Sequence, residues 1–231
     1  SNGDTVGQVL IYEIQSGTWK LIHKIIGEAN IDYFGGSVDA SYDGTIVVVG
    51  GHLNDGGGVD SGHVRVYQQQ GGQGEWVQLG GDVDGLTSTN YFGVDVASSN
   101  SSLTFAAGAH SSDSVNQNSG QVRVMEYDSG QWNPKGDPIA DFPPNSAAGH
   151  RIALSADGNT VAITVDENTA GEVRVFQYAA NVNGGWIPKG SAIVGEAPGD
   201  MSGSSVAISA DGLRIAIGAS FNGENNAGHV R

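Results

Sequence analysis

The chain has 231 residues, of which 25 are acidic and 10 are basic, and its formal net charge is −15. A surface this acidic repels phosphate groups, which argues against nucleic acid and anionic membranes as partners and favours cations or basic groups. The absence of cysteine excludes disulfide bonds and thiolate metal sites. No apolar run approaches the roughly 20 residues of a membrane-spanning helix, so membrane insertion is not expected.

Three sequence markers recur with one period of about 55 residues. A Gly-x-Val motif begins at Gly7, Gly62, Gly120, Gly171 and Gly228. The four tryptophans are Trp19, Trp76, Trp132 and Trp186. A further glycine opens an alternating segment at Gly35, Gly93, Gly149 and Gly203. Because the three series keep the same spacing, the chain is predicted to be a repeat protein.

Each period contains four segments that read as short strands, called A to D. The chain opens on a C segment (7–12) and a D segment (19–22), three complete A-B-C-D sets follow, and it closes on a fourth A, a fourth B and the start of a C segment. The A segments are 35–41, 93–99, 149–155 and 203–209; the B segments are 45–50, 103–108, 160–164 and 214–218. The later C segments are 62–67, 120–127 and 171–176, and the later D segments, which carry tryptophan, are 76–79, 132–135 and 186–189.

The connection between A and B carries an Asp-Gly dipeptide at 43–44, 157–158 and 211–212, and Asn100 takes this place in the second repeat. Asp-Gly accepts positive φ angles, so a two-residue hairpin and antiparallel pairing of A with B are expected. Four short antiparallel strands per period predict the blade of a β-propeller. The expected fold class is therefore all-β, a β-propeller of four-stranded blades.

The whole chain, 1–231, is expected to form one propeller region. Its predicted divisions are a partial blade of outer strands (1–29), three blades (30–80, 81–136 and 137–190) and a second partial blade (191–231). We expect a segment of a larger propeller, because 228–231 would compete with 7–12 for the C position if the ring closed. A closed ring of four blades is the alternative.

The repeat resembles the FG-GAP family, whose blades form integrin α-chain propellers. The resemblance is carried by Phe34-Gly35 and Phe92-Gly93 at the start of strand A and by Gly108-Ala109 and Gly218-Ala219 at the end of strand B. It implies a propeller fold and an extracellular binding role. Such blades often carry an Asp-x-Asp-x-Asp-Gly calcium loop between A and B, but the Asp-Gly turn here is too short for it, so that site is not carried over.

Acidic residues gather in the B–C and D–A connections, which should emerge on one face of the blades because strand direction alternates. Fifteen of the 25 acids lie there: Asp4, Glu28, Asp32, Asp55, Asp60, Asp82, Asp84, Asp113, Asp137, Asp141, Asp166, Glu167, Glu196, Asp200 and Glu224. Carboxylates suit Ca²⁺. The candidate metal ligands are Glu28, Asp32, Asp55, Asp60, Glu196 and Asp200, with Asn54 as a further oxygen donor. The simpler alternative is that these residues form a solvated acidic surface that binds no specific ion.

Three further residue types recur with the period, and each is predicted to be structural. His63 and His229 share one position at the start of strand C and are expected on the surface. The strand C arginines, Arg65, Arg123, Arg174 and Arg231, are expected to be paired and to cover apolar surface with their stems. The tryptophans are expected to pack between neighbouring blades.

No nucleophile elbow, zinc motif or phosphate loop is present. The sequence therefore predicts a non-enzymatic binding or structural module, with an acidic face for a protein, glycan or cation and a place in a larger chain or assembly. The alternatives are a carboxylate-based polysaccharide hydrolase or lyase and a calcium-stabilised adhesion module. An extracellular or cell-surface location is expected, although no signal peptide begins this chain; the sequon at Asn100-Ser101-Ser102 supports it.

Overall fold

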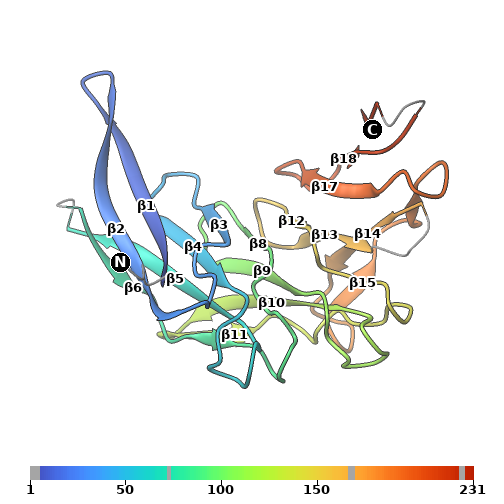
Figure 1. Cartoon of the computed structure of the whole chain (residues 1–231), viewed down its shortest axis with the longest axis horizontal. Coiled ribbons are helices and arrows are strands. Elements are labelled where there is room, and N and C mark those ends of the chain that lie inside the picture. Colours follow the sequence, from blue (N-terminus) through green and yellow to red (C-terminus); the bar gives the residue numbers. More distant parts are fainter. Residues whose placement is uncertain (1–5, 72–73, 166–169, 224–226) are drawn as a thin grey trace.

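The computed structural model describes residues 6–71, 74–165, 170–223 and 227–231, and every element in them is a β-strand. The strands form five small antiparallel sheets that follow one another along an arc (Figure 1). We call the sheets blades 1 to 5 in chain order. The all-β propeller fold is therefore confirmed. The described residues contain no helix that could cross a membrane.

The three central blades have the predicted strand order A-B-C-D. Blade 2 consists of β3 (Ser37–Ala40), β4 (Ile46–Gly51), β5 (His63–Gln70) and β6 (Glu75–Gln78), with β7 (Val83–Asp84) also paired to β5. Blade 3 consists of β8 (Val96–Ser98), β9 (Thr104–Ala109), β10 (Gln121–Asp128) and β11 (Gln131–Pro134). Blade 4 consists of β12 (Ile152–Leu154), β13 (Thr160–Val165), β14 (Glu172–Tyr178) and β15 (Trp186–Pro188), with β16 (Ile193–Val194) paired to β14.

The two end blades lie at opposite ends of the arc (Figure 1). Blade 1 pairs β1 (Val6–Gln15) with β2 (Thr18–Asn30), and blade 5 has the order β17 (Ser202–Ile208), β18 (Ile215–Ala219), β19 (His229–Val230). β19 therefore fills the C position of blade 5. This is the position for which, as the sequence indicated, residues 228–231 would compete with 7–12 in a closed ring. Among the described strands, β1 and β2 pair only with each other. That the chain is a segment of a larger propeller stays a prediction.

The A–B hairpin is longer than the predicted two-residue turn. The N–H of Ser41 still bonds to the carbonyl of Ile46, so four residues close the loop. The Asp43 carboxylate fills this loop, since it accepts hydrogen bonds from the Ser41 hydroxyl at 2.7 Å and from the Thr45 N–H at 3.0 Å. The same Ser–Asp contact recurs at Ser155–Asp157 and Ser209–Asp211. These carboxylates stabilise hairpins.

The D strand is also longer than predicted, because it continues past the tryptophan segment to the start of strand C. In blade 2 it resumes as β7, where His63 pairs with Asp84, and in blade 1 it is the single long strand β2. The predicted boundary at 80/81 therefore cuts this sheet.

Two of the acidic residues predicted in D–A loops lie on strands instead: Glu28 is on β2 and Asp84 is on β7, which corrects the sequence prediction. Four further acidic residues predicted in the B–C and D–A connections, Asp4, Asp166, Glu167 and Glu224, lie outside the described residues.

The core lies between neighbouring blades. One cluster joins Val48, Val64 and Val66 of blade 2 to Phe105 and Ala107 of blade 3, and a second joins blades 3 and 4. Two of the tryptophans make the predicted contact between blades: Trp132 Nε1 donates a 2.8 Å hydrogen bond to the Leu79 carbonyl of the preceding blade, and Trp186 donates one of 2.7 Å to the Lys135 carbonyl. Trp19, in blade 1, is exposed, so the prediction was wrong for this residue.

Candidate functional site

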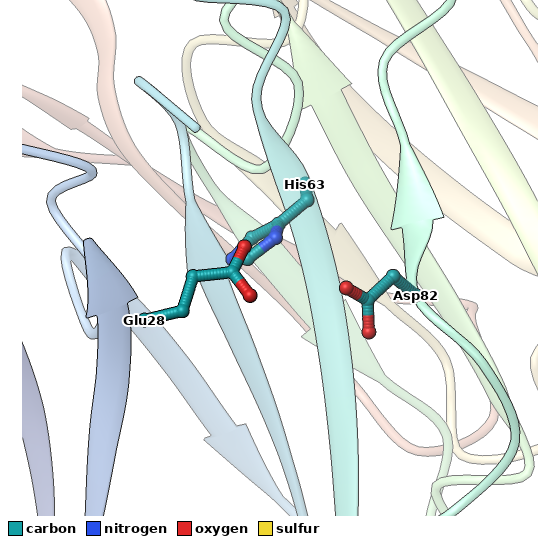
Figure 2. A group of neighbouring side chains, drawn as sticks. All are labelled: Glu28, His63 and Asp82. Carbon is teal, nitrogen blue, oxygen red and sulfur yellow. The ribbon is translucent and has the colours of Figure 1, made fainter. Parts of the chain in front are cut away.

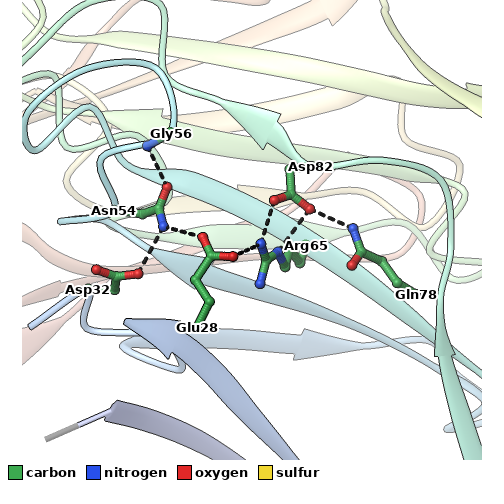
Figure 3. Close-up of polar contacts among 7 residues, drawn as sticks. All are labelled: Glu28, Asp32, Asn54, Gly56, Arg65, Gln78 and Asp82. Atoms are coloured by element: carbon green, nitrogen blue, oxygen red, sulfur yellow. Dashed lines mark hydrogen bonds and ion pairs between the residues drawn. The ribbon is translucent and has the colours of Figure 1, made fainter. Parts of the chain in front are cut away.

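Polar side chains of blades 1 and 2 form one connected network on the face where the B–C and D–A connections emerge (Figure 3). We call it the acidic rim. It contains Glu28 at the end of β2, Asp32 in the following connection, Asn54 in the B–C loop, Arg65 on β5 and Asp82 just before β7. Two of the predicted metal ligands, Glu28 and Asp32, are therefore brought together here.

Asn54 organises the buried half of the acidic rim. Its Nδ2 donates to Glu28 Oε1 at 2.7 Å and to Asp32 Oδ2 at 2.9 Å, and its Oδ1 accepts from the N–H of Gly56 at 2.8 Å. Asp32 and Asn54 are both buried. The amide thus supplies the donors that two adjacent carboxylates need.

Arg65 organises the outer half of the acidic rim. Its Nη2 lies 2.5 Å from both Glu28 Oε2 and Asp82 Oδ2, and its Nε donates to Asp82 Oδ1 at 2.8 Å. The hydrogen bonds from this guanidinium lower the pKa of Glu28 and of Asp82. Both carboxylates are therefore held in the charged form.

The same arrangement recurs between blades 4 and 5. Asn222 Nδ2 donates to Glu196 Oε2 at 3.2 Å and to Asp200 Oδ2 at 2.9 Å, while Arg231 Nη2 lies 2.5 Å from Glu196 Oε1. The repeated Glu/Asp pairs found in the sequence are thus two copies of one inter-blade network. Each copy already contains the cation and the amide that balance its carboxylates.

The six predicted metal ligands do not form one group. Glu28 with Asp32, and Glu196 with Asp200, lie in the two separate networks. Asp55 and Asp60 belong to the B–C loop of blade 2, where the Asp60 N–H donates to Asp55 Oδ1 at 2.9 Å. Calcium binding by these residues stays a prediction.

His63 is buried, which corrects its predicted surface position. It is 1% exposed because its ring packs edge to face against the Phe34 ring, at a centroid distance of 6.1 Å, and lies against Gly51 of the neighbouring strand. Burial lowers the pKa of its imidazole. Figure 2 shows His63 beside the carboxylates of Glu28 and Asp82. One ligand atom from each of the three residues lies within 4.8 Å of the other two.

A row of five rings crosses blades 2 to 4 at the start of strand A and the end of strand B. We call it the ring row; it consists of Tyr33, His52, Tyr91, His110 and His150. Successive ring centroids are 5.2, 6.4, 5.3 and 5.4 Å apart, and Tyr91 stacks on His110 with an interplanar angle of 18°. Tyr33 is 57% exposed and His150 is also exposed. Sequence reasoning missed the ring row.

The central imidazoles of the ring row are neutral at pH 7. Burial lowers the pKa of His52, and burial followed by the charge of His150 lowers the pKa of His110 to about 4. A neutral imidazole presents an aromatic face without a full charge. The middle of the ring row is therefore an uncharged aromatic surface on an otherwise acidic face.

A groove of about 640 Å³ lies between blades 3 and 4. Ile139, Phe176 and Trp186 line its apolar wall, and Arg174 and Asp137 stand at its edge. Arg174 lies over the Phe142 ring at 5.8 Å, and Arg123 lies over the Phe92 ring at 4.6 Å. These two arginines lie over apolar rings, and Arg65 and Arg231 are paired with carboxylates, as predicted for strand C arginines.

No protein-family model matches this sequence, and no curated protein sequence matches it. The FG-GAP resemblance therefore stays a prediction. Its residues do have a clear place in the fold. Phe34 and Phe92 are buried, and Gly62 of blade 2 forms a parallel bridge to Phe92 at the entry to blade 3.

Solved structures share the fold over nearly the whole chain. A protein of unknown function from Desulfotomaculum acetoxidans matches with a TM-score of 0.61 and 15% identity, over 99% of this chain and 62% of that one. A Bacteroides uniformis protein provisionally assigned as a 6-phosphogluconolactonase matches with a TM-score of 0.57 and 12% identity, over 99% of this chain and 67% of that one. Sqt1 from Saccharomyces cerevisiae gives a TM-score of 0.55 and 16% identity, over 99% of this chain and 58% of that one.

At these identities the similarity establishes the propeller fold alone. The chain spans 62% of the length of the first of these structures. What any of these proteins binds or converts does not transfer to this chain through the fold.

Proposed function

We propose that the chain is a non-enzymatic binding module and that the ring row is its contact surface for a glycan. The observation that carries the proposal is the unbroken succession of Tyr33, His52, Tyr91, His110 and His150 across three blades. Sugar rings present apolar C–H faces that pack on aromatic rings, and the hydroxyl groups around them need polar neighbours. A neutral aromatic row on a polar face supplies both.

Position in the fold supports this proposal. Tyr33 and Tyr91 lie in D–A connections, and His52 and His110 open the B–C loops, so the rings sit on loops held by a rigid sheet scaffold. Loops of this kind carry binding surfaces in many folds. The carboxylates of the acidic rim support the loops, because Asn54 and Arg65 tie them together.

We also propose that the protein acts outside the cell or on its surface, within a larger chain or assembly. The sequon residue Asn100 supports this proposal, because it is exposed in the A–B hairpin of blade 3 and a glycan could be attached there without disturbing the core. Endoglycosidase treatment of the protein isolated from its own cells tests it. A mobility shift that Asn100→Gln abolishes would support the location, and an Asn100 that carries no glycan would contradict it.

Binding to an array of defined oligosaccharides, followed by calorimetry on the hits, tests the glycan proposal. Tyr33→Ala and Tyr91→Ala should each weaken binding at least tenfold, because stacking on an aromatic ring is lost. Tyr42→Ala is the matched control, because Tyr42 is an exposed tyrosine outside the ring row, and it should leave binding unchanged. An array without hits, or an equal loss of binding in Tyr42→Ala, would contradict the proposal.

A carboxylate-based hydrolase is the second candidate, favoured by one observation. Asp82 and Asp84 have pKa values shifted in opposite directions, lowered by Arg65 for Asp82 and raised by burial for Asp84. Divergent carboxyl pKa values are typical of acid and base pairs. Cleavage of an array hit, abolished in Asp84→Asn, would replace the binding proposal with this one.

A further inference from the structure

We propose that Glu28, His63 and Asp82 form a site for a divalent transition metal such as Zn²⁺, which competes with Arg65 for the two carboxylates. The site is distinct from the ring row. It shares Glu28 with the calcium ligands predicted from the sequence, but its other two ligands, His63 and Asp82, were not among them. It joins blade 1, through Glu28, to blade 2, through His63 and Asp82.

His63 gives the first argument. The side chain is 1% exposed, and neither ring nitrogen has a hydrogen-bond partner among the described residues. An unpartnered buried nitrogen normally costs free energy, so it calls for a ligand that satisfies it. The ring nitrogen of a neutral imidazole that carries no proton can only accept, and so can the two carboxylates, so these three groups supply no donor to one another. A metal ion satisfies all three at once.

The geometry of the three side chains gives the second argument. Their ligand atoms lie within 4.8 Å of one another (Figure 2). Zn²⁺ binds imidazole nitrogen at about 2.0–2.1 Å and carboxylate oxygen at about 2.0–2.2 Å, so tetrahedral ligand atoms are about 3.4 Å apart and these would have to close by up to about 1.4 Å. Glu28 and Asp82 are the partly exposed members, with side chains 47% and 31% exposed, and they can make this movement.

Neighbouring amides orient the carboxylates. Asn54 donates to Glu28 Oε1 at 2.7 Å, and Gln78 donates to Asp82 Oδ1 at 2.6 Å. Such outer contacts fix the direction of metal ligands and are typical of metal sites. A mixed nitrogen and oxygen donor set favours Zn²⁺ and related transition metals over Ca²⁺, which prefers oxygen alone.

Arg65 is the competitor for this site. Its guanidinium contacts both carboxylates at 2.5 Å and neutralises part of their charge. A metal ion that binds there must displace the guanidinium, so the wild-type affinity is reduced by the free energy of those contacts. Removal of Arg65 should therefore strengthen metal binding.

Calorimetric titration with ZnCl₂ and visible absorption with Co²⁺ test the site. Wild-type protein should bind one Zn²⁺ per chain and melt at a higher temperature with Zn²⁺ than with a chelator, since a ligand of the folded state stabilises it. Arg65→Met should bind at least tenfold more tightly. Glu28→Gln, Asp82→Asn and His63→Gln should each weaken binding at least tenfold, and His63→Gln should also change the Co²⁺ spectrum.

His23→Gln and Asp55→Asn are the controls, because they remove an imidazole and a carboxylate that lie outside the cluster. Both should bind as the wild type does. If His63→Gln does not fold, Glu28→Gln and Asp82→Asn test the site instead, because both side chains are partly exposed and their replacement should not prevent folding. The proposal is overturned if neither wild type nor Arg65→Met binds Zn²⁺, or if the controls lose as much affinity as the cluster variants.

Discussion

The side-chain amide of Asn54 donates a 2.9 Å hydrogen bond to Asp32, and both residues are buried. Asp32 lies before the first strand of blade 2, and Asn54 follows its second strand. The bond therefore holds a D–A connection and a B–C connection together. A buried carboxylate that loses its donor keeps its desolvation cost, so the pair should contribute measurably to stability.

Replacement of Asn54 by alanine should lower the free energy of unfolding by about 1–3 kcal/mol, because Asp32 and Glu28 both lose a donor. Urea unfolding measures this loss. The exposed Asn100, replaced by alanine, is the control and should change the value by less than about 0.5 kcal/mol. Equal effects of the two substitutions would show that the Asn54 network does not stabilise the acidic rim.

Trp132→Ala should lower the free energy of unfolding by about 3–5 kcal/mol, because its ring packs between blades 2 and 3 and its Nε1 bonds to Leu79. Trp19 occupies the equivalent position in blade 1 but is 67% exposed. Trp19→Ala should therefore change stability by no more than about 0.5 kcal/mol. Thermal and urea unfolding of the two variants check the difference, and a similar loss in both would contradict an inter-blade role for Trp132.

Gly62→Ala should destabilise the protein more than Gly130→Ala does. Both glycines have positive φ, +76° and +87°, so both substitutions introduce backbone strain. Only at Gly62 would the new Cβ meet another atom, the carbonyl oxygen of Phe92 at 2.1 Å, whereas space around Gly130 is open. The extra cost should be about 1–3 kcal/mol in urea unfolding. If Gly130→Ala costs as much, close packing of the blades does not explain the glycine repeat.

The fold could be predicted because the repeat markers record the contact between neighbouring blades. Gly62 recurs where the chain meets Phe92 of the next blade, and Trp132 recurs where a ring packs on the preceding one. Each interface between blades requires the same close backbone approach and the same packed ring, so the same residue types recur at each period. The hairpin length and the extension of strand D escaped prediction, because the pairing of Ser41 with Ile46 and of His63 with Asp84 is decided by tertiary contacts.

The candidate sites were only partly predictable. Glu28 and Asp32 attract attention as a repeated acid pair, but their cation, Arg65, lies on the next blade, 37 residues from Glu28. Spacing within one loop does not reveal such a partner. The ring row did leave a signal: Tyr33 and Tyr91, like His52 and His110, are 58 residues apart, which is the local period of the repeat.

The stability of the protein should fall as the pH drops from about 6.5 to about 4, and His110 should cause part of this fall. Burial, with smaller contributions from the charges of His150, His52 and Arg151, lowers the pKa of His110 from 6.5 to about 4 in the folded protein. Between these values the unfolded chain binds a proton that the folded protein does not, so acid favours unfolding. Below pH 4 both states are protonated and the effect reaches its limit.

His110→Phe removes this titration and keeps a ring that can stack on Tyr91. The free energy of unfolding, measured by urea at several pH values between 7 and 4.5, should therefore fall less steeply for the variant than for the wild type. The carboxylates of Glu28 and Asp82 contribute equally to both proteins, and because Arg65 lowers their folded pKa, their share of the stability is lost only as the pH falls through these lowered values. Identical slopes for the two proteins would mean that His110 is not held neutral by burial in the ring row.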